Sequence, residues 1–264
     1  MTAQKYSENA IKRLAHVQSH VEHNYSRNEN AVQNILHGRG NPHACAIGLS
    51  SNAKANAMFS WFKHHDLVVM KQWAYVSGKL IQFYYKMEED ASDLGSGFPE
   101  FLMPLLSDNE TLIDWLTHYD LAYDMKRAEN HKTFDFLAYQ KNIALRGDWK
   151  RLIARCEKVL SDPPKASNQE KYLLDHYFFL ALAQGDIEKM QSTLLELVSP
   201  KSIRARSNDE GGYTEDLICT SAVIYSKIAW RHGYKIKVES PYVPLEWLPI
   251  ESLPRYENHY SFLK

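Results

Sequence analysis

The fold class follows from the stretch Ile143-Ala144-Leu145-Arg146-Gly147-Asp148-Trp149-Lys150-Arg151-Leu152. A second stretch repeats its pattern, Ala181-Leu182-Ala183-Gln184-Gly185-Asp186-Ile187-Glu188-Lys189-Met190, with the two Gly-Asp pairs 38 residues apart. Glycine can adopt the left-handed conformation that ends one helix, and the aspartate after it can cap the next helix. Each copy therefore predicts two helices joined by a tight turn, at a spacing typical of helical repeats.

Apolar residues at helical spacing extend this prediction to most of the chain. Strand patterns are nearly absent, and residues 235–238 are the one short candidate. A loop is expected over residues 93–104, where glycines and prolines gather. Further helices are predicted at residues 7–25, at 50–87 in two parts divided near His64-His65-Asp66, at 109–124, and at 214–232 before Gly233. A short second helix is expected before the break at residues 38–42.

The residues after the last predicted helix form a proline-rich tail. Prolines at positions 241, 244, 249 and 254 make residues 240–264 extended rather than helical. We expect Tyr242, Trp247 and Leu248 to pack back on the helices. The sequence thus predicts an all-α fold of stacked antiparallel helical hairpins with a docked Pro-rich tail, in a single domain spanning residues 1–264. Its parts would be N-terminal helices (7–130), two repeated hairpins (133–198), and a last helix with the tail (214–264).

The composition of the chain argues against several classes of partner and location. The 264 residues carry a formal net charge of −1, so no overall charge favours nucleic acid or an anionic membrane as a partner. The three cysteines lie far apart, which indicates reduced thiols rather than a disulfide framework. The N-terminus has no apolar signal core, and no segment is apolar enough for a membrane helix. These features predict a cytoplasmic protein.

Two groups of histidines raise the question of a metal site. His16, His20 and His23 share one helical face at a spacing that zinc ligands use, but no other ligand completes a site, and a solvated row explains them. The sequence His64-His65-Asp66 resembles the central motif of metal-dependent phosphohydrolases of the HD class. The outer ligands of such a site would be His37 or His43 and Asp90 or Asp93. Chance adjacency and helix capping explain this motif equally well, so no catalytic residue, cofactor or metal ligand is predicted.

An acidic window is the strongest electrostatic feature of the chain. Residues 88–124 contain ten acidic residues and no lysine or arginine, which leaves a net charge of +9 on the rest of the chain. The acids are Glu88, Glu89, Asp90, Asp93, Glu100, Asp108, Glu110, Asp114, Asp120 and Asp124.

Four of these acids form the candidate partner-binding site. On one continuous helix over residues 109–124, a single arc would hold Glu110, Asp114, Asp120 and Asp124, opposite an apolar arc. Like charges four residues apart cost a helix roughly 0.2–0.5 kcal/mol per pair. Such a face either pairs with basic residues of the same chain or docks a basic partner.

The C-terminal half carries a recognisable set of motifs. They are residues 144–149, 175–178 and 182–186, and the last helix (218–233) with residues 238–249, Val-Glu-Ser-Pro-Tyr-Val-Pro-Leu-Glu-Trp-Leu-Pro. With these motifs the sequence resembles the immunity protein 49 family of bacterial proteins that neutralise polymorphic toxins. The resemblance covers residue 70 to the C-terminus.

The resemblance implies a non-enzymatic cytoplasmic inhibitor. Its partner would be a cognate toxin encoded nearby and delivered by contact-dependent or type VI secretion, and some toxins of this kind are nucleases with basic clefts. The alternatives are a helical-repeat adaptor that binds a peptide, and the HD-type phosphohydrolase.

Overall fold

The all-α prediction is confirmed by a computed structural model that describes residues 7–91, 99–164 and 167–263. No strand forms in these ranges, and residues 235–238 are extended without a partner strand. The chain divides into two compact units. Unit 1 comprises residues 1–115, 212–217 and 251–264, and unit 2 comprises residues 116–211 and 218–250. The single-domain organisation stays a prediction.

The helices of unit 1 begin where polar side chains cap them. Ser7 and Asn41 accept hydrogen bonds from Ala10 N and Ala44 N, at the starts of α1 and α3. Asp66 caps the fourth helix in the same way, as expected, through Val69 N at 2.9 Å. The elements are α1 (Glu8–His23), α2 (Tyr25–Leu36), α3 (Pro42–His64), α4 (Leu67–Ala91) and α5 (Leu102–Ser107), followed by α6 (Glu110–His118), which runs past residue 115.

Several helix boundaries differ from those expected. The last predicted helix, over residues 214–232, begins only at Thr220 because residues 212–217 form turns. The first helix ends at His23 rather than Tyr25, and the Asn24 side-chain nitrogen donates to His20 O and so satisfies a carbonyl at the end of α1; α2 is the short second helix that was expected. Helix α3 begins at Pro42, because proline suits the first turn of a helix. Helix α5 occupies part of the predicted loop, and the rest of that loop, residues 92–98, lies outside the described residues.

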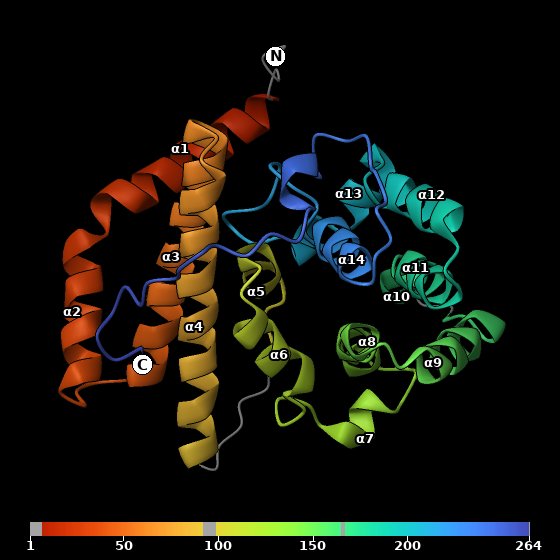
Figure 1. The fold of residues 1–264 in the computed structure, drawn as a ribbon, viewed down its shortest axis with the longest axis horizontal. Helices are drawn as coiled ribbons and strands as arrows, with labels where there is room; N and C mark the ends of the chain where they lie inside the picture. The colour runs from red at the N-terminus through yellow and green to blue at the C-terminus, as the bar shows by residue number, and fades with distance from the viewer. Residues whose placement is uncertain (1–6, 92–98, 165–166, 264) are drawn as a thin grey trace. The chain divides into compact units, whose positions relative to one another are not determined.

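The core of unit 1 is built on the long helices α3 and α4, which lie side by side (Figure 1). Residues 251–263 run along α4, and Leu263 is buried in the cluster that includes Leu49 of α3 and Leu80 of α4. Lys71 of α4 donates to Glu251 O at 2.6 Å and pairs with buried Asp108 at 2.9 Å. The segment that ends at Leu263 is therefore part of this core.

The predicted hairpins form the centre of unit 2. The first is α8 (Phe134–Arg146) with α9 (Trp149–Ser161), and the second is α11 (Leu173–Gln184) with α12 (Ile187–Leu197). Helix α11 packs against α9, so the hairpins are stacked. Unit 2 also contains α7 (Met125–Ala128), α10 (Ser167–Glu170), α13 (Pro200–Ala205), η1 (Ser207–Asp209), α14 (Thr220–Arg231) and η2 (Leu245–Trp247).

Both Gly-Asp turns have the geometry that the sequence predicts. Gly147 and Gly185 are left-handed, with φ of 69° and 72°, and end α8 and α11. Asp148 and Asp186 then cap α9 and α12 by accepting from the backbone N–H three residues later, at 3.3 and 2.9 Å. The predicted helix–turn–helix geometry is therefore confirmed at both turns.

The docked tail is also confirmed within unit 2. Trp247 and Leu248 are fully buried, while Tyr242 is half-buried and its carbonyl accepts from Cys219 N at 2.9 Å. The buried ammonium of Lys227 on α14 donates to the carbonyls of Trp247 and Pro249, at 3.0 and 3.3 Å. A search of the described residues found no helix with the length and apolarity needed to cross a bilayer.

Candidate functional site

Two of the four predicted partner-binding acids lie on α6. Glu110 and Asp114 are one helical turn apart, and both side chains are exposed. The opposite face holds buried Leu112 and Ile113, so the helix presents its acids to solvent as the sequence predicts.

The single arc of four acids is wrong, because α6 ends at His118 rather than continuing to Asp124. Side chains of α8 cap its last carbonyls: Asn142 donates to Leu116 O at 2.8 Å, and Arg146 donates to Thr117 O at 2.9 Å. These bonds replace the ones that a longer helix would have made.

The other two predicted acids therefore lie in the segment after α6. Asp120 is half-buried and forms an ion pair with Arg146. Asp124 is exposed and caps α7, accepting from Lys126 N at 2.9 Å. Both carboxylates thus have structural roles.

Further acids of the window pair within the chain. Glu100 meets Lys54 at 2.5 Å, and buried Asp108 meets Lys71 at 2.9 Å. The alternative of internal pairing is therefore correct for these two and for Asp120. Four acids fall outside the part of the window whose side chains are described: Glu88, Glu89, Asp90 and Asp93.

The residues of the HD-like motif act as helix caps and ring contacts. His65 ends α3 in the left-handed conformation with its ring 5.6 Å from that of Trp61, and His64 packs edge-on against Phe59. Asp66 caps α4. No three His, Cys, Asp or Glu side chains converge in a ligand arrangement anywhere among the described residues. The proposed outer ligands Asp90 and Asp93 lie outside the described side chains.

The histidine row of α1 borders a groove in unit 1. The hydroxyl of Tyr213 lies 3.0 Å from the His20 ring nitrogens, and the His16 ring stacks on the same tyrosine. Burial, with His16 and Arg27 adding to it, lowers the pKa of His20 below its usual value of 6.5. His20 is therefore neutral at pH 7.

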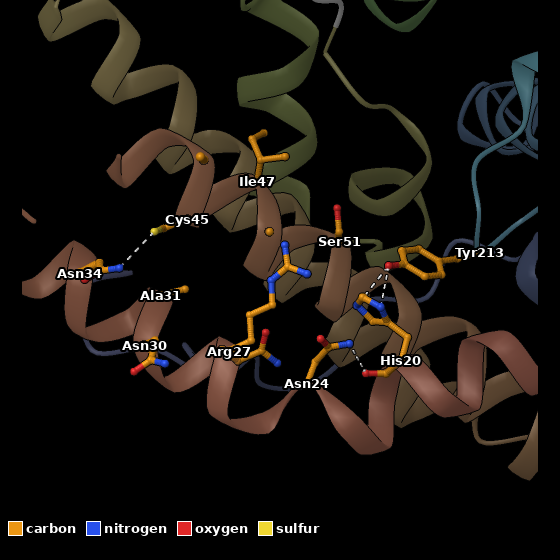
Figure 2. Close-up of a pocket in the computed structure, with 13 residues that line it drawn as sticks. His20, Asn24, Arg27, Asn30, Ala31, Asn34, Cys45, Ile47, Ser51 and Tyr213 are labelled. Carbon is orange, nitrogen blue, oxygen red and sulfur yellow. Dashed lines mark hydrogen bonds between the residues drawn. The ribbon is translucent and has the colours of Figure 1, made fainter. Parts of the chain in front are cut away.

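The groove lies between α2 and α3 and has a volume of about 640 Å³ (Figure 2). Asparagines dominate the α2 side, and Arg27 reaches from α2 into the space between the helices. Sequence reasoning missed this feature. Its one local signal is the run of asparagines between Asn24 and Asn34.

Comparison with known proteins identifies the family. The sequence model of the family described as Immunity protein 49 matches residues 71–247, about two thirds of the chain. The chain belongs to the Immunity protein 49 family. Membership implies an immunity protein and suggests a non-enzymatic role.

The Immunity protein 49 match agrees with the resemblance read from the sequence. It includes both Gly-Asp hairpins and the tail as far as Trp247, and it begins within α4. Most of the groove precedes it, since of the groove's lining residues only Tyr213 falls within the match. No curated protein sequence and no solved structure matches the chain.

Proposed function

We propose that this protein binds and neutralises a cognate bacterial toxin through a stoichiometric protein–protein interaction in the cytoplasm. The family match over residues 71–247 carries the proposal. The toxin would be encoded next to the immunity gene and delivered by contact-dependent or type VI secretion.

The chemistry of the surface supports binding rather than catalysis. Helix α6 presents Glu110 and Asp114 to solvent. Many toxins that act on nucleic acid have a basic cleft, and an acidic face on the inhibitor would speed encounter with it. A nuclease is therefore the toxin class that this surface fits best.

The proposed partner-binding residues are Glu110, Asp114, Asp120 and Asp124. Glu110 and Asp114 would contribute most, because both are exposed and lie one helical turn apart on α6, whereas Asp120 is half-buried beside Arg146 and Asp124 lies in the segment after α6. Charges at the rim of an interface act mainly on the association rate.

The first experiment is co-expression with the adjacent gene product, followed by co-purification and calorimetry. We expect a complex of fixed stoichiometry and loss of toxicity. A neighbouring toxin that stays toxic and does not co-purify would contradict the proposal.

The second experiment locates the interface. Glu110→Lys with Asp114→Lys should slow association and flatten its salt dependence while leaving the melting temperature little changed. The matched control is Glu157→Lys with Glu188→Lys, which makes the same charge change on exposed positions of α9 and α12. A larger loss for the control pair would place the partner on the Gly-Asp hairpins instead.

The peptide-adaptor alternative has a structural observation in its favour, namely the groove between α2 and α3. That groove lies in unit 1 rather than in the predicted hairpins.

A further inference from the structure

The groove between α2 and α3 holds one cation and no acid among its described lining residues. The cation is Arg27, which is exposed and makes no hydrogen bond or ion pair with another described residue. His20 adds no charge at neutral pH, since burial lowers its pKa. An arginine without a carboxylate partner presents five N–H donors in a planar fork that suits a carboxylate of a ligand.

A row of amide side chains lies beside this cation. Asn24, at the junction of α1 and α2, lines the groove, followed by Asn28 four residues later on α2 and by Asn34 six residues further along, with Ala31 between the last two. Four residues of a helix rise about 6 Å, and two residues of an extended chain advance about 6.7 Å. Each amide carries both donors and an acceptor, so successive asparagines can meet the N–H and C=O groups of an extended backbone.

The α3 side leaves room for such a backbone. Ala44 and Gly48 line the groove there, and a Cβ added to Gly48 would meet no other atom within 4 Å. Ile47, which is 40% exposed, also lines the groove and adds apolar surface. The α3 side therefore combines small residues with one larger apolar side chain.

We propose that this groove binds an extended peptide segment that carries an aspartate or glutamate, with Arg27 holding the carboxylate and the asparagines holding the backbone. A single-stranded nucleic acid fits less well, because its repeating phosphates call for several cations along the groove. Ten residue steps from Asn24 to Asn34 span about 15 Å, enough for four or five extended residues. The inference does not depend on toxin neutralisation, and its test needs no toxin.

The test uses the full chain and a phage-displayed library of random dodecapeptides. Binders are selected on the wild type after depletion on Gly48→Leu, a variant that fills the groove from a helical position with space for the new side chain. Selected peptides are then made with a fluorescein label and measured by fluorescence polarisation. We expect the selected peptides to share an aspartate or glutamate.

Variants then locate the carboxylate. Arg27→Gln should weaken binding about tenfold, the size of a charge-assisted hydrogen bond. Changing the acid of the peptide to its amide should lower the affinity of the wild type by the same factor. The same change should lower the affinity of Arg27→Gln little, because the acid then has no arginine to interact with. Arg39→Gln is the matched control, since Arg39 is an exposed arginine just after α2 that does not line the groove. Unchanged melting curves verify that each variant is folded.

Three results would overturn the inference. The selection could yield no peptide that binds the wild type better than Gly48→Leu. The selected peptides could lack an aspartate or glutamate, or Arg27→Gln could bind them as tightly as the wild type does. Binding of a labelled dodecathymidylate that Gly48→Leu abolishes would assign the groove to nucleic acid. Competition by millimolar acetate that removes all peptide binding would assign it to small carboxylates.

Discussion

Arg206 forms a bidentate ion pair with Asp175, in which the two terminal guanidinium nitrogens donate to the two carboxylate oxygens at 2.7 and 3.0 Å. The side chains are only 8% and 1% exposed, and the hydroxyl of Tyr225 also donates to Asp175. Burial, and then the charge of Asp175, raises the pKa of Tyr225, so this hydroxyl keeps its proton. Asp175 begins one of the segments that carry the family resemblance, and its role here is structural.

Removing one partner of this buried pair should be costly. Asp175→Asn is expected to lower the free energy of unfolding by about 3–5 kcal/mol, because it removes the buried counter-ion of Arg206 and leaves only the more exposed Asp209, 3.2 Å away. Asp175→Leu combined with Arg206→Met should cost less than the single change. The control is Glu257→Gln, which removes the exposed ion pair between Glu257 and Arg255. It should change the free energy of unfolding by no more than about 0.5 kcal/mol. Denaturant unfolding measures all three, and a single change as mild as the control would contradict the prediction.

Stability should fall as the pH drops below about 6.5, in part through His176. Burial, and then the positive charge of Arg155, lowers the pKa of this histidine to about 4 against an opposing effect of Asp175, and its Nδ1 has no hydrogen-bond partner among the described residues. The unfolded chain therefore binds a proton before the folded protein does. His176 contributes stability that is present at pH 7 and is lost as the pH falls from 6.5 towards 4, by about 2 kcal/mol at pH 5.

The measurement for His176 is the midpoint of urea unfolding at pH 7 and at pH 5. His176→Phe keeps an aromatic ring of similar size beside Phe136 and should reduce the difference between the two pH values. An unchanged difference would assign the pH dependence to other groups.

The tail should stabilise unit 2 through Trp247, which is 1% exposed. Trp247→Ala is expected to cost about 3–5 kcal/mol by leaving a cavity. Leu245→Ala is the matched control, because Leu245 belongs to the same short 3-10 helix but is 43% exposed. Thermal melts should separate the two variants clearly, and equal melting temperatures would mean that the tail contributes little.

The two Gly-Asp turns should differ in their tolerance of alanine. Both glycines are left-handed, so either substitution should cost about 1–2 kcal/mol. The added Cβ at Gly185 would also lie 3.1 Å from the Tyr234 hydroxyl, whereas at Gly147 the nearest atom is 3.6 Å away. Gly185→Ala should therefore be the more destabilising in denaturant titrations, and the reverse order would contradict the argument.

Local chemistry explains why the hairpins could be predicted from the sequence. The αL glycine and the capping aspartate act within three residues of their own positions, so Gly147 and Asp148 predict the turn from the local sequence alone. The end of α6 could not be predicted, because the groups that cap it belong to Asn142 and Arg146, more than twenty residues later. Helix ends fixed by distant side chains leave no local signal.

The acidic window shows the same limit for the candidate site. Counting charges found the excess of acids, but Asp108 and Asp120 are paired with Lys71 and Arg146, which lie outside the window. The groove was missed because it depends on how α2 packs beside α3, and on Tyr213, a distant residue that lies close to α1.

Unit 1 includes residues from both ends of the described chain, and this has a consequence for synthesis on the ribosome. Leu263 belongs to the same cluster as Leu49, so unit 1 cannot finish its core until residue 263 has emerged. Unit 2 needs nothing beyond residue 250. At roughly 5–20 residues per second, α1 to α4 would wait about ten seconds or more for their last packing partner. The unit whose synthesis starts first is therefore the last to be completed.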